Sequence, residues 1–343
     1  MPKIPPLSEP DVIELLKLWS NIGAATVQPT QRQGASNTTY MVDAKAGKFI
    51  LKLYGDSTLT TQIQYEHSLL AYLHSADLSF AVPAPVPAKT GETLVLVNRN
   101  DTLHLVALQP LLSGQPADRL NPRHTRAAGQ ALGELHRVLA EFDPPGQLAQ
   151  LPSWGDLNHI HPLVTDPMEV PQSLALTPNQ QARLVKTLTE VLVEKPRLYK
   201  TLPVQTIHAD YLSPHVLLES NRVVGVVDFE FATKDLRLWD YICGLEHFAL
   251  FPWKEESHWQ LVQAFSAGYS QQVSLTQREA EALTRAWRLQ RASSIVYWTG
   301  WLREGKVTLP SVVKAVTETL LLEDWFEDNA TKLLSESNLA IAS

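Results

Sequence analysis

Residues 206–240 read TIHADYLSPHVLLESNRVVGVVDFEFATKDLRLWD, and this stretch decides how the rest of the chain is interpreted. Two short apolar runs within it, 216–218 and 223–227, contain β-branched residues and flank the turn-forming residues 220–222. Runs of this kind, bounded by turn residues, are typical of strands that pair as a hairpin. The stretch therefore predicts a small buried hairpin.

Polar side chains stand at both ends of this predicted hairpin. His208 and Asp210 precede it, His215 stands directly before its first strand, and Asp228 follows its second strand. An isolated buried carboxylate is very costly, so each acid must be solvated, paired or bound to a metal. Two acids at opposite ends of a hairpin can lie close in space, where one accepts a proton and the other holds a hard cation. The alternative is a metal-dependent hydrolase that uses all four residues as one cluster.

Length and composition indicate a globular protein with about two domains. A chain of 343 residues exceeds the usual size of one domain, which is about 150 residues. Hydrophobic residues make up 44% of the chain and charged residues 19%, values that argue against bulk disorder. The single cysteine, Cys243, permits no internal disulfide and fits a reducing compartment, so a cytoplasmic location is expected.

The N-terminal sequence argues against a signal peptide, and the net charge argues against some classes of partner. The first residues, MPKIPPLSEPDVIELL, lack the basic and apolar segments of a signal peptide, and no apolar run approaches the ~18 residues of a membrane span. A formal net charge of -7 argues against nucleic acid or an anionic membrane as the main partner, because both require a basic surface. A ligand that is cationic or complexed with a metal fits this charge.

The first third of the chain predicts a small antiparallel sheet with a helix. Strand-like runs occur at 40–42, 49–54, 93–97 and 103–108, and an amphipathic helical pattern covers 59–78. Proline and glycine then predict a linker at 109–116. The remainder is expected to be mainly helical, with long segments at 123–142, 179–194 and 277–303.

Lys52 and Glu66 are expected to form a buried pair. Lys52 interrupts a strand on a face that it shares with apolar neighbours. Glu66 falls on the apolar stripe of the following helix, at helical spacing with Ile63, Leu70 and Leu73. A carboxylate on a core-facing stripe needs a partner, and Lys52 is the nearest candidate.

Two other segments have a plain and a functional interpretation. The polar loop QGASNTT at 33–39 is either an ordinary hairpin turn or a cover for phosphates. Trp287, Trp298 and Trp301 recur with Arg288 and Arg291, either as core packing with a solvated basic edge or as a substrate wall. In a substrate wall the arginines would favour a carboxylate, whereas tryptophan faces and the negative net charge would favour a cation.

The order of these features resembles the protein-kinase-like fold of small-molecule phosphotransferases. This group includes aminoglycoside and macrolide phosphotransferases, choline kinase and type II homoserine kinase. HAD at 208–210 followed by GVVDFEFATKDLRLWDY at 225–241 is most similar to the homoserine kinase-like members. The resemblance covers nearly the whole chain. It implies an α+β bilobal fold, with an N-terminal nucleotide-binding lobe at 1–110 and a larger, mainly helical catalytic and substrate-binding lobe at 111–343.

The resemblance also implies roles for individual residues. Lys52 would contact the α and β phosphates and Glu66 would orient it. Asp210 would accept the proton of the attacking hydroxyl or position that hydroxyl, Asp228 would bridge Mg²⁺ to the phosphates, and Asp240 would brace the catalytic loop. The remaining nucleotide contacts would come from the phosphate-covering loop and the hinge, at Gly34, Ser36, Asn37, Thr38, Gln109 and Leu111.

One position departs from the family pattern. Five residues after the catalytic aspartate the family usually has an asparagine as its second metal ligand, and this chain has His215. Neutral imidazole binds divalent ions, but Mg²⁺ prefers oxygen, so His215 weakens one metal site or favours Mn²⁺. Some macrolide and aminoglycoside phosphotransferases resemble this chain in having histidine there.

The implied function is an ATP-dependent kinase, with GTP as the alternative nucleotide, that phosphorylates a hydroxyl of a small molecule. An amino alcohol such as homoserine or choline is the leading acceptor class, and the expected state is a monomer or a homodimer. The alternatives are an aminoglycoside or macrolide antibiotic as the acceptor, or a catalytically weak nucleotide-binding pseudokinase.

Overall fold

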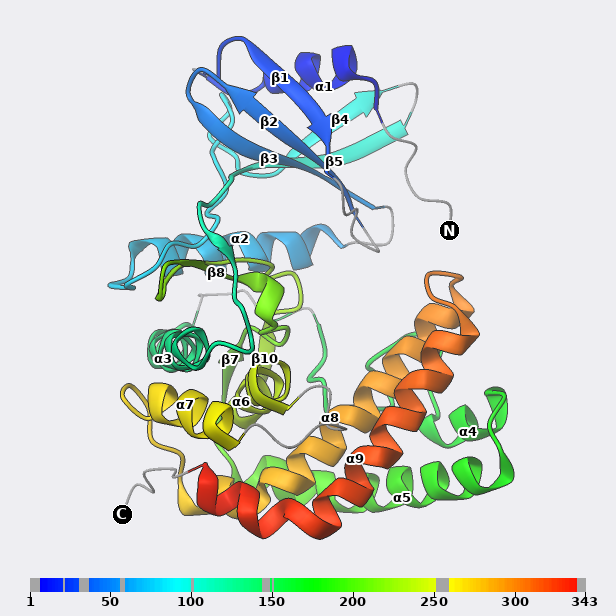
Figure 1. Cartoon of the computed structure of the whole chain (residues 1–343). Coiled ribbons are helices and arrows are strands. Elements are labelled where there is room, and N and C mark those ends of the chain that lie inside the picture. Colours follow the sequence, from blue (N-terminus) through cyan, green and yellow to red (C-terminus); the bar gives the residue numbers. More distant parts are fainter. Residues whose placement is uncertain are drawn as a thin grey trace. The chain divides into compact units, whose positions relative to one another are not determined.

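The computed structural model describes residues 7–20, 22–30, 37–55, 59–99, 102–143, 149, 151–250 and 259–337 (Figure 1). Within it the chain forms two compact units. The first unit comprises Met1–Gly114, Asp143–Gln150 and Val224–Glu230, and the second comprises Gln115–Phe142, Leu151–Val223 and Phe231–Ser343.

An antiparallel five-stranded sheet forms the centre of the first unit. Its strands are β1 (Ala25–Pro29), β2 (Thr38–Ala44), β3 (Gly47–Tyr54), β4 (Val95–Arg99) and β5 (Thr102–Pro110), in the spatial order β1-β2-β3-β5-β4. The two helices of this unit are α1 (Glu9–Leu16) and α2 (Thr60–Ser75). Val12 and Leu16 of α1 pack with Tyr40, Leu51 and Val106 of the sheet in one buried core.

The predicted linker begins later than the sequence pattern indicates. Strand β5 continues through Gln109, which pairs with Ile50, and ends at Pro110 opposite Phe49. Proline is tolerated at the end of a strand, where its missing N–H removes no interior ladder hydrogen bond. Gln109 is therefore part of the sheet and not of a loop.

The second unit is mainly helical. Its helices are α3 (Pro122–Leu139), η1 (Pro167–Glu169), α4 (Val170–Ser173), α5 (Pro178–Thr201), η2 (Ser213–His215), α6 (Arg237–Leu245), η3 (Glu246–Leu250), α7 (Trp259–Tyr269), α8 (Gln277–Arg303) and α9 (Leu309–Glu336). Among the described helices, none combines the length and the apolar character that crossing a membrane requires.

Short strands accompany these helices. They are β6 (Gln115–Pro116), β7 (Val204–Ile207), β8 (Val216–Glu219), β9 (Arg222–Val226) and β10 (Thr233–Leu236), with β7 paired to β10 and the others in the order β6-β8-β9. The chain passes from the second unit to the first within β9. Neighbouring β8 and β9 confirm the hairpin predicted from residues 216–227, and the sheet and helices together confirm the α+β prediction.

Helix α5 is longer than predicted because packing overrides a proline. Pro196 lies inside the helix, which continues to Thr201. Proline removes one backbone N–H and normally ends or kinks a helix. Beyond it, Leu198 is buried, and the hydroxyl of Tyr199 donates a hydrogen bond to the carboxylate of Asp235. These tertiary contacts hold the last turn in place.

Close packing of α3 against α7 positions a buried histidine. An added Cβ at Gly129 would lie 2.1 Å from the carbonyl oxygen of Phe265, which shows how closely the two helices approach. This approach sets His136 of α3 against Tyr269 of α7, with 2.9 Å between Nδ1 and the hydroxyl oxygen.

His67 should make the first unit sensitive to acid. Burial lowers the pKa of His67 from 6.5 to about 4, and the Lys52 ammonium acts in the same direction. As the pH falls through this window, the unfolded chain binds a proton that the folded chain does not, so stability is lost on acidification. We expect His67→Gln to reduce the loss in unfolding free energy between pH 7 and pH 4 by on the order of 3 kcal/mol. Urea denaturation of the two proteins at both pH values measures this difference.

The exposed His74, on the same helix, provides the matched control. His74→Gln should leave the pH dependence unchanged. An identical loss of stability in the wild type and in His67→Gln would contradict the prediction.

Candidate active site

A buried carboxylate holds the loop that follows β7. The Oδ2 atom of Asp240 accepts a hydrogen bond from the backbone N–H of His208, and its Oδ1 atom accepts one from Ala209, both at 2.7 Å. Nε2 of His136 lies 3.3 Å from Oδ2 of the same carboxylate, which is fully buried. Ala209 has a φ of +66°, a left-handed conformation that costs an L-residue about 1–2 kcal/mol. The charge-assisted hydrogen bonds that Asp240 accepts from the backbone offset this strain.

This loop presents Asp210 beside His215. The backbone N–H of Asp210 donates to Nδ1 of His208 at 3.2 Å. Nδ1 of His215 lies 2.9 Å from the carbonyl oxygen of Asp210 and 3.3 Å from its carboxylate. Because a carbonyl oxygen only accepts, Nδ1 of His215 is the donor in this hydrogen bond.

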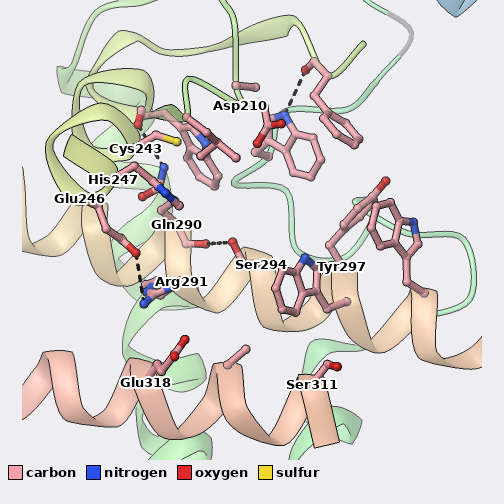
Figure 2. A pocket seen from close by; sticks show the side chains of 18 of the residues that line it. Asp210, Cys243, Glu246, His247, Gln290, Arg291, Ser294, Tyr297, Ser311 and Glu318 are labelled. Atoms are coloured by element: carbon pink, nitrogen blue, oxygen red, sulfur yellow. Dashed lines mark hydrogen bonds and ion pairs between the residues drawn. The ribbon is translucent and has the colours of Figure 1, made fainter. Parts of the chain in front are cut away.

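Asp210 lines a cavity of about 640 Å³ in the second unit (Figure 2). Six aromatic residues line it, Trp154, Phe231, Trp239, Tyr297, Trp298 and Trp301. The ring of Tyr297 contacts those of Trp154 and Trp301 at centroid distances of 5.0 and 4.9 Å. Among the described residues, the charged ones in the lining are Asp210, Glu246, Arg291, Lys314 and Glu318, three acids against two bases.

The three tryptophans of α8 do not share one role. Trp287 is fully buried, and its indole N–H donates to Oε2 of Glu246 at 2.7 Å. Trp298 and Trp301 line the cavity. The core interpretation therefore holds for Trp287, and the substrate-wall interpretation of the other two, which line a cavity, stays a prediction.

Arg288 and Arg291 of α8 also differ in their positions relative to the cavity. Arg291 lines the cavity, and its Nη2 atom lies 3.2 Å from Oε1 of Glu246 (Figure 2). Arg288 does not line it, and its Nη1 atom lies 4.0 Å from Glu190 of α5. One arginine of the predicted pair thus faces the cavity.

The expected pair of Lys52 and Glu66 is present in the first unit. Nζ of Lys52 lies 3.7 Å from Oε1 of Glu66, and both side chains are buried. Burial would lower the pKa of Lys52, but the carboxylates of Glu66 and Glu230 contribute to raising it well above its usual value. Burial raises the pKa of Glu66 to about 7 although Lys52 acts in the opposite direction. One ammonium is therefore shared among more acids than it can neutralise.

Glu230 is the additional acid that the sequence interpretation missed. Its Oε2 atom lies 3.3 Å from Nζ of Lys52 and accepts a hydrogen bond from Nδ2 of Asn37 at 2.8 Å. Its backbone carbonyl accepts from Gln62 of α2 at 3.2 Å. The only sequence signal was an acid two residues after Asp228, where protein kinases have glycine.

Two further acids were missed, at Glu246 and Glu318 of the cavity wall. Glu246 interrupts the apolar run YICGLEHFAL at 241–250, which is a signal that a buried carboxylate needs a partner. Glu318 had no such signal, because it follows Lys314 at the i, i+4 spacing of an ordinary surface ion pair.

The other predicted site residues have the following places. Asp228 belongs to the first unit and has a φ of +72°, whereas His215 belongs to the second, so their shared metal site stays a prediction. Asn37 is buried, Thr38 begins β2, Gln109 is buried in β5, and Leu111 follows that strand. Gly34 and Ser36 lie outside the described residues.

Comparisons of the sequence with known proteins point to one family of enzymes. A profile of the phosphotransferase enzyme family matches residues 29–282. A homoserine kinase of Caulobacter vibrioides (strain NA1000 / CB15N) is 26% identical over 267 residues, which are 77% of this chain and 78% of that protein.

Two solved structures share the fold. The microcompartment-associated aminopropanol kinase matches with a TM-score of 0.74 and 19% identity, over 94% of this chain and 98% of that one. An amicoumacin kinase in complex with AMP-PNP and Ca²⁺ matches with a TM-score of 0.68 and 14% identity, over 91% and 93% of the two chains. These matches confirm the predicted kinase-like fold.

Asp240 should be essential for the loop. An asparagine has one acceptor oxygen, so Asp240→Asn leaves one of the two backbone N–H groups facing an amide N–H₂ inside the core. We expect a loss of about 2 kcal/mol or more in unfolding free energy, since a buried unsatisfied donor costs about 1–3 kcal/mol and more beside a lost charge. Chemical denaturation measures the loss.

Ala209→Gly is the matched control in the same loop, because glycine adopts positive φ without steric cost. It should keep or slightly raise stability. Wild-type stability in Asp240→Asn would show that the carboxylate does not hold the loop.

Proposed function

The chain belongs to the phosphotransferase enzyme family and is a small-molecule kinase, and on this basis we propose that it transfers the terminal phosphoryl group of ATP to a hydroxyl of an amino alcohol. Homoserine is the leading acceptor, because homoserine kinases are among its relatives. The observation that carries the proposal is the placement of Asp210 in the wall of the aromatic and acidic cavity. In this account residues 1–110 bind the nucleotide and residues 111–343 bind the acceptor.

Asp210 is the proposed base. The acceptor hydroxyl oxygen forms a bond to the terminal phosphorus of ATP while the bond from that phosphorus to the leaving oxygen of ADP breaks, and the hydroxyl proton passes to Asp210. Transfer of this kind depends on positioning and on charge stabilisation. The hydrogen bonds that fix the backbone from His208 to Asp210 provide the positioning.

Lys52 is the proposed phosphate ligand. Its ammonium is buried among the carboxylates of Glu66 and Glu230, which keep it protonated. Phosphate oxygens of a bound nucleotide would join this cluster, and Glu66 would hold the ammonium in place. The hinge at Gln109 and Leu111 and the loop containing Asn37 and Thr38 complete the proposed nucleotide site, and GTP is the alternative nucleotide.

Asp228 and His215 are the proposed ligands of a divalent ion. A carboxylate oxygen suits Mg²⁺, and a basic imidazole Nε2 suits Mn²⁺ better, so this donor set fits a divalent cation. When bound, the ion neutralises charge on the phosphates.

An amine is the favoured charged group of the acceptor. Acids outnumber bases, three to two, among the described residues of the cavity wall, and aromatic faces attract cations. Aminoglycoside and macrolide acceptors are the alternative, and binding of ATP without transfer to any acceptor would favour a non-catalytic nucleotide-binding protein.

Asp210→Asn should abolish most of the turnover and leave nucleotide binding intact. Loss of a general base typically lowers the rate by about 10²- to 10⁴-fold, and Asp210 lies in the acceptor cavity. A coupled assay of acceptor-dependent ADP release measures kcat, and titration with ATP measures the dissociation constant.

Asp77→Asn is the control, since Asp77 is an exposed loop residue of the first unit. It should behave like the wild type. Full turnover in Asp210→Asn would remove the assigned role.

A further inference from the structure

We propose that Arg291, oriented by Glu246, binds a carboxylate of the acceptor, so that the enzyme selects a zwitterionic amino-acid alcohol over the same amino alcohol without its carboxylate. This inference rests on the proposed kinase function and names the substrate class of the same cavity. The two kinds of relative differ in this respect, because homoserine has a carboxylate and aminopropanol has none.

Arg291 is the buried cation of the cavity wall. In the part of the chain that the structure describes, Lys314 and Arg291 are the lysine and arginine of the lining; the Lys314 side chain on α9 is 73% exposed, whereas that of Arg291 on α8 is 15% exposed. A carboxylate placed beside Arg291 is removed from water, where an ionic hydrogen bond to a guanidinium is stronger than at the surface. Of these two cations, Arg291 is therefore expected to form the stronger ionic hydrogen bond with a bound carboxylate.

Glu246 holds the guanidinium in a fixed position. Its two carboxylate oxygens contact different residues, with Oε2 accepting from the indole N–H of Trp287 and Oε1 lying 3.2 Å from Nη2 of Arg291. It is the first residue of the π-helical turn η3, and such turns are common at functional sites. A guanidinium has five N–H donors, so one that pairs with a protein carboxylate can also receive a ligand carboxylate.

The neighbouring helix α9 offers a partner for an ammonium group at Glu318, whose Oε1 atom also lies 3.7 Å from Nζ of Lys314. Glu318 belongs to α9 and Arg291 to the facing helix α8, and both line the cavity (Figure 2). An acceptor with a carboxylate and an ammonium matches this arrangement of one base and one acid. A simple amine uses only the acidic side.

The plainer interpretation is that Arg291 merely neutralises Glu246. In that case a substitution of Arg291 affects acceptors with and without a carboxylate equally. The two interpretations therefore predict different effects on the ratio of kcat/KM for an acceptor with a carboxylate to kcat/KM for one without it.

The test compares homoserine with 3-aminopropan-1-ol, which is homoserine without its carboxylate. We expect kcat/KM of the wild type to favour homoserine. In Arg291→Gln the ratio of the two kcat/KM values should fall by roughly 10- to 100-fold, mainly through KM, since a hydrogen bond to a charged group contributes about 1.5–3 kcal/mol. Arg288→Gln is the control, because Arg288 lies one helical turn earlier and outside the cavity wall. It should keep the wild-type ratio.

Arg291→Lys is a second variant, which keeps the inference testable if Arg291→Gln does not fold. It retains the charge beside Glu246 but loses the bidentate fork, so the ratio should fall less than in Arg291→Gln and still below the wild type. An unchanged ratio in either folded Arg291 variant, or no preference for homoserine in the wild type, overturns the inference and leaves the kinase function standing. Absence of transfer to both acceptors, with Mg²⁺ or Mn²⁺, instead overturns the proposed function.

Discussion

The buried carboxylate of Asp240 is the constraint on which the acceptor side of the enzyme depends. It accepts the backbone N–H groups of His208 and Ala209 and thereby holds a residue with positive φ directly before Asp210. Strained backbone persists only where the surroundings enforce it, and it is frequent at functional sites. Asp240 contacts no reacting group in this account. It acts by fixing the direction of Asp210.

The two units differ in how their buried charges are paired. In the first, Lys52 lies among more carboxylates than it can neutralise, and burial raises the pKa of Glu66 to about 7. Lys52 therefore stays protonated, while the Glu66 carboxyl takes up a proton near neutral pH. In the second, the pair of Glu246 and Arg291 lies on the cavity wall beside aromatic rings. That arrangement suits the small, charged acceptor that we propose.

Sequence periodicity predicted the parts of the site that lie on regular elements. Glu66 was identified because a carboxylate on an apolar helical stripe needs a partner, and its pairing with Lys52 is confirmed. The position of Glu230 depends on how a loop folds back to Lys52, which no local pattern encodes. The difference between Arg288 and Arg291 depends on which face of α8 meets the cavity, and a helix that packs against α5, α6 and α9 has no single apolar stripe to reveal it.

The central claim is that this chain phosphorylates the hydroxyl of an amino alcohol with ATP. Its most direct test is phosphorus NMR of a reaction that contains the wild-type protein, homoserine and MgATP. A parallel reaction contains MnATP, and the Mn²⁺ is removed before the spectrum is recorded. The account predicts a new phosphomonoester resonance that grows in step with ADP and requires the acceptor. Release of inorganic phosphate without that resonance, or ATP that stays intact with every amino alcohol supplied, would contradict it.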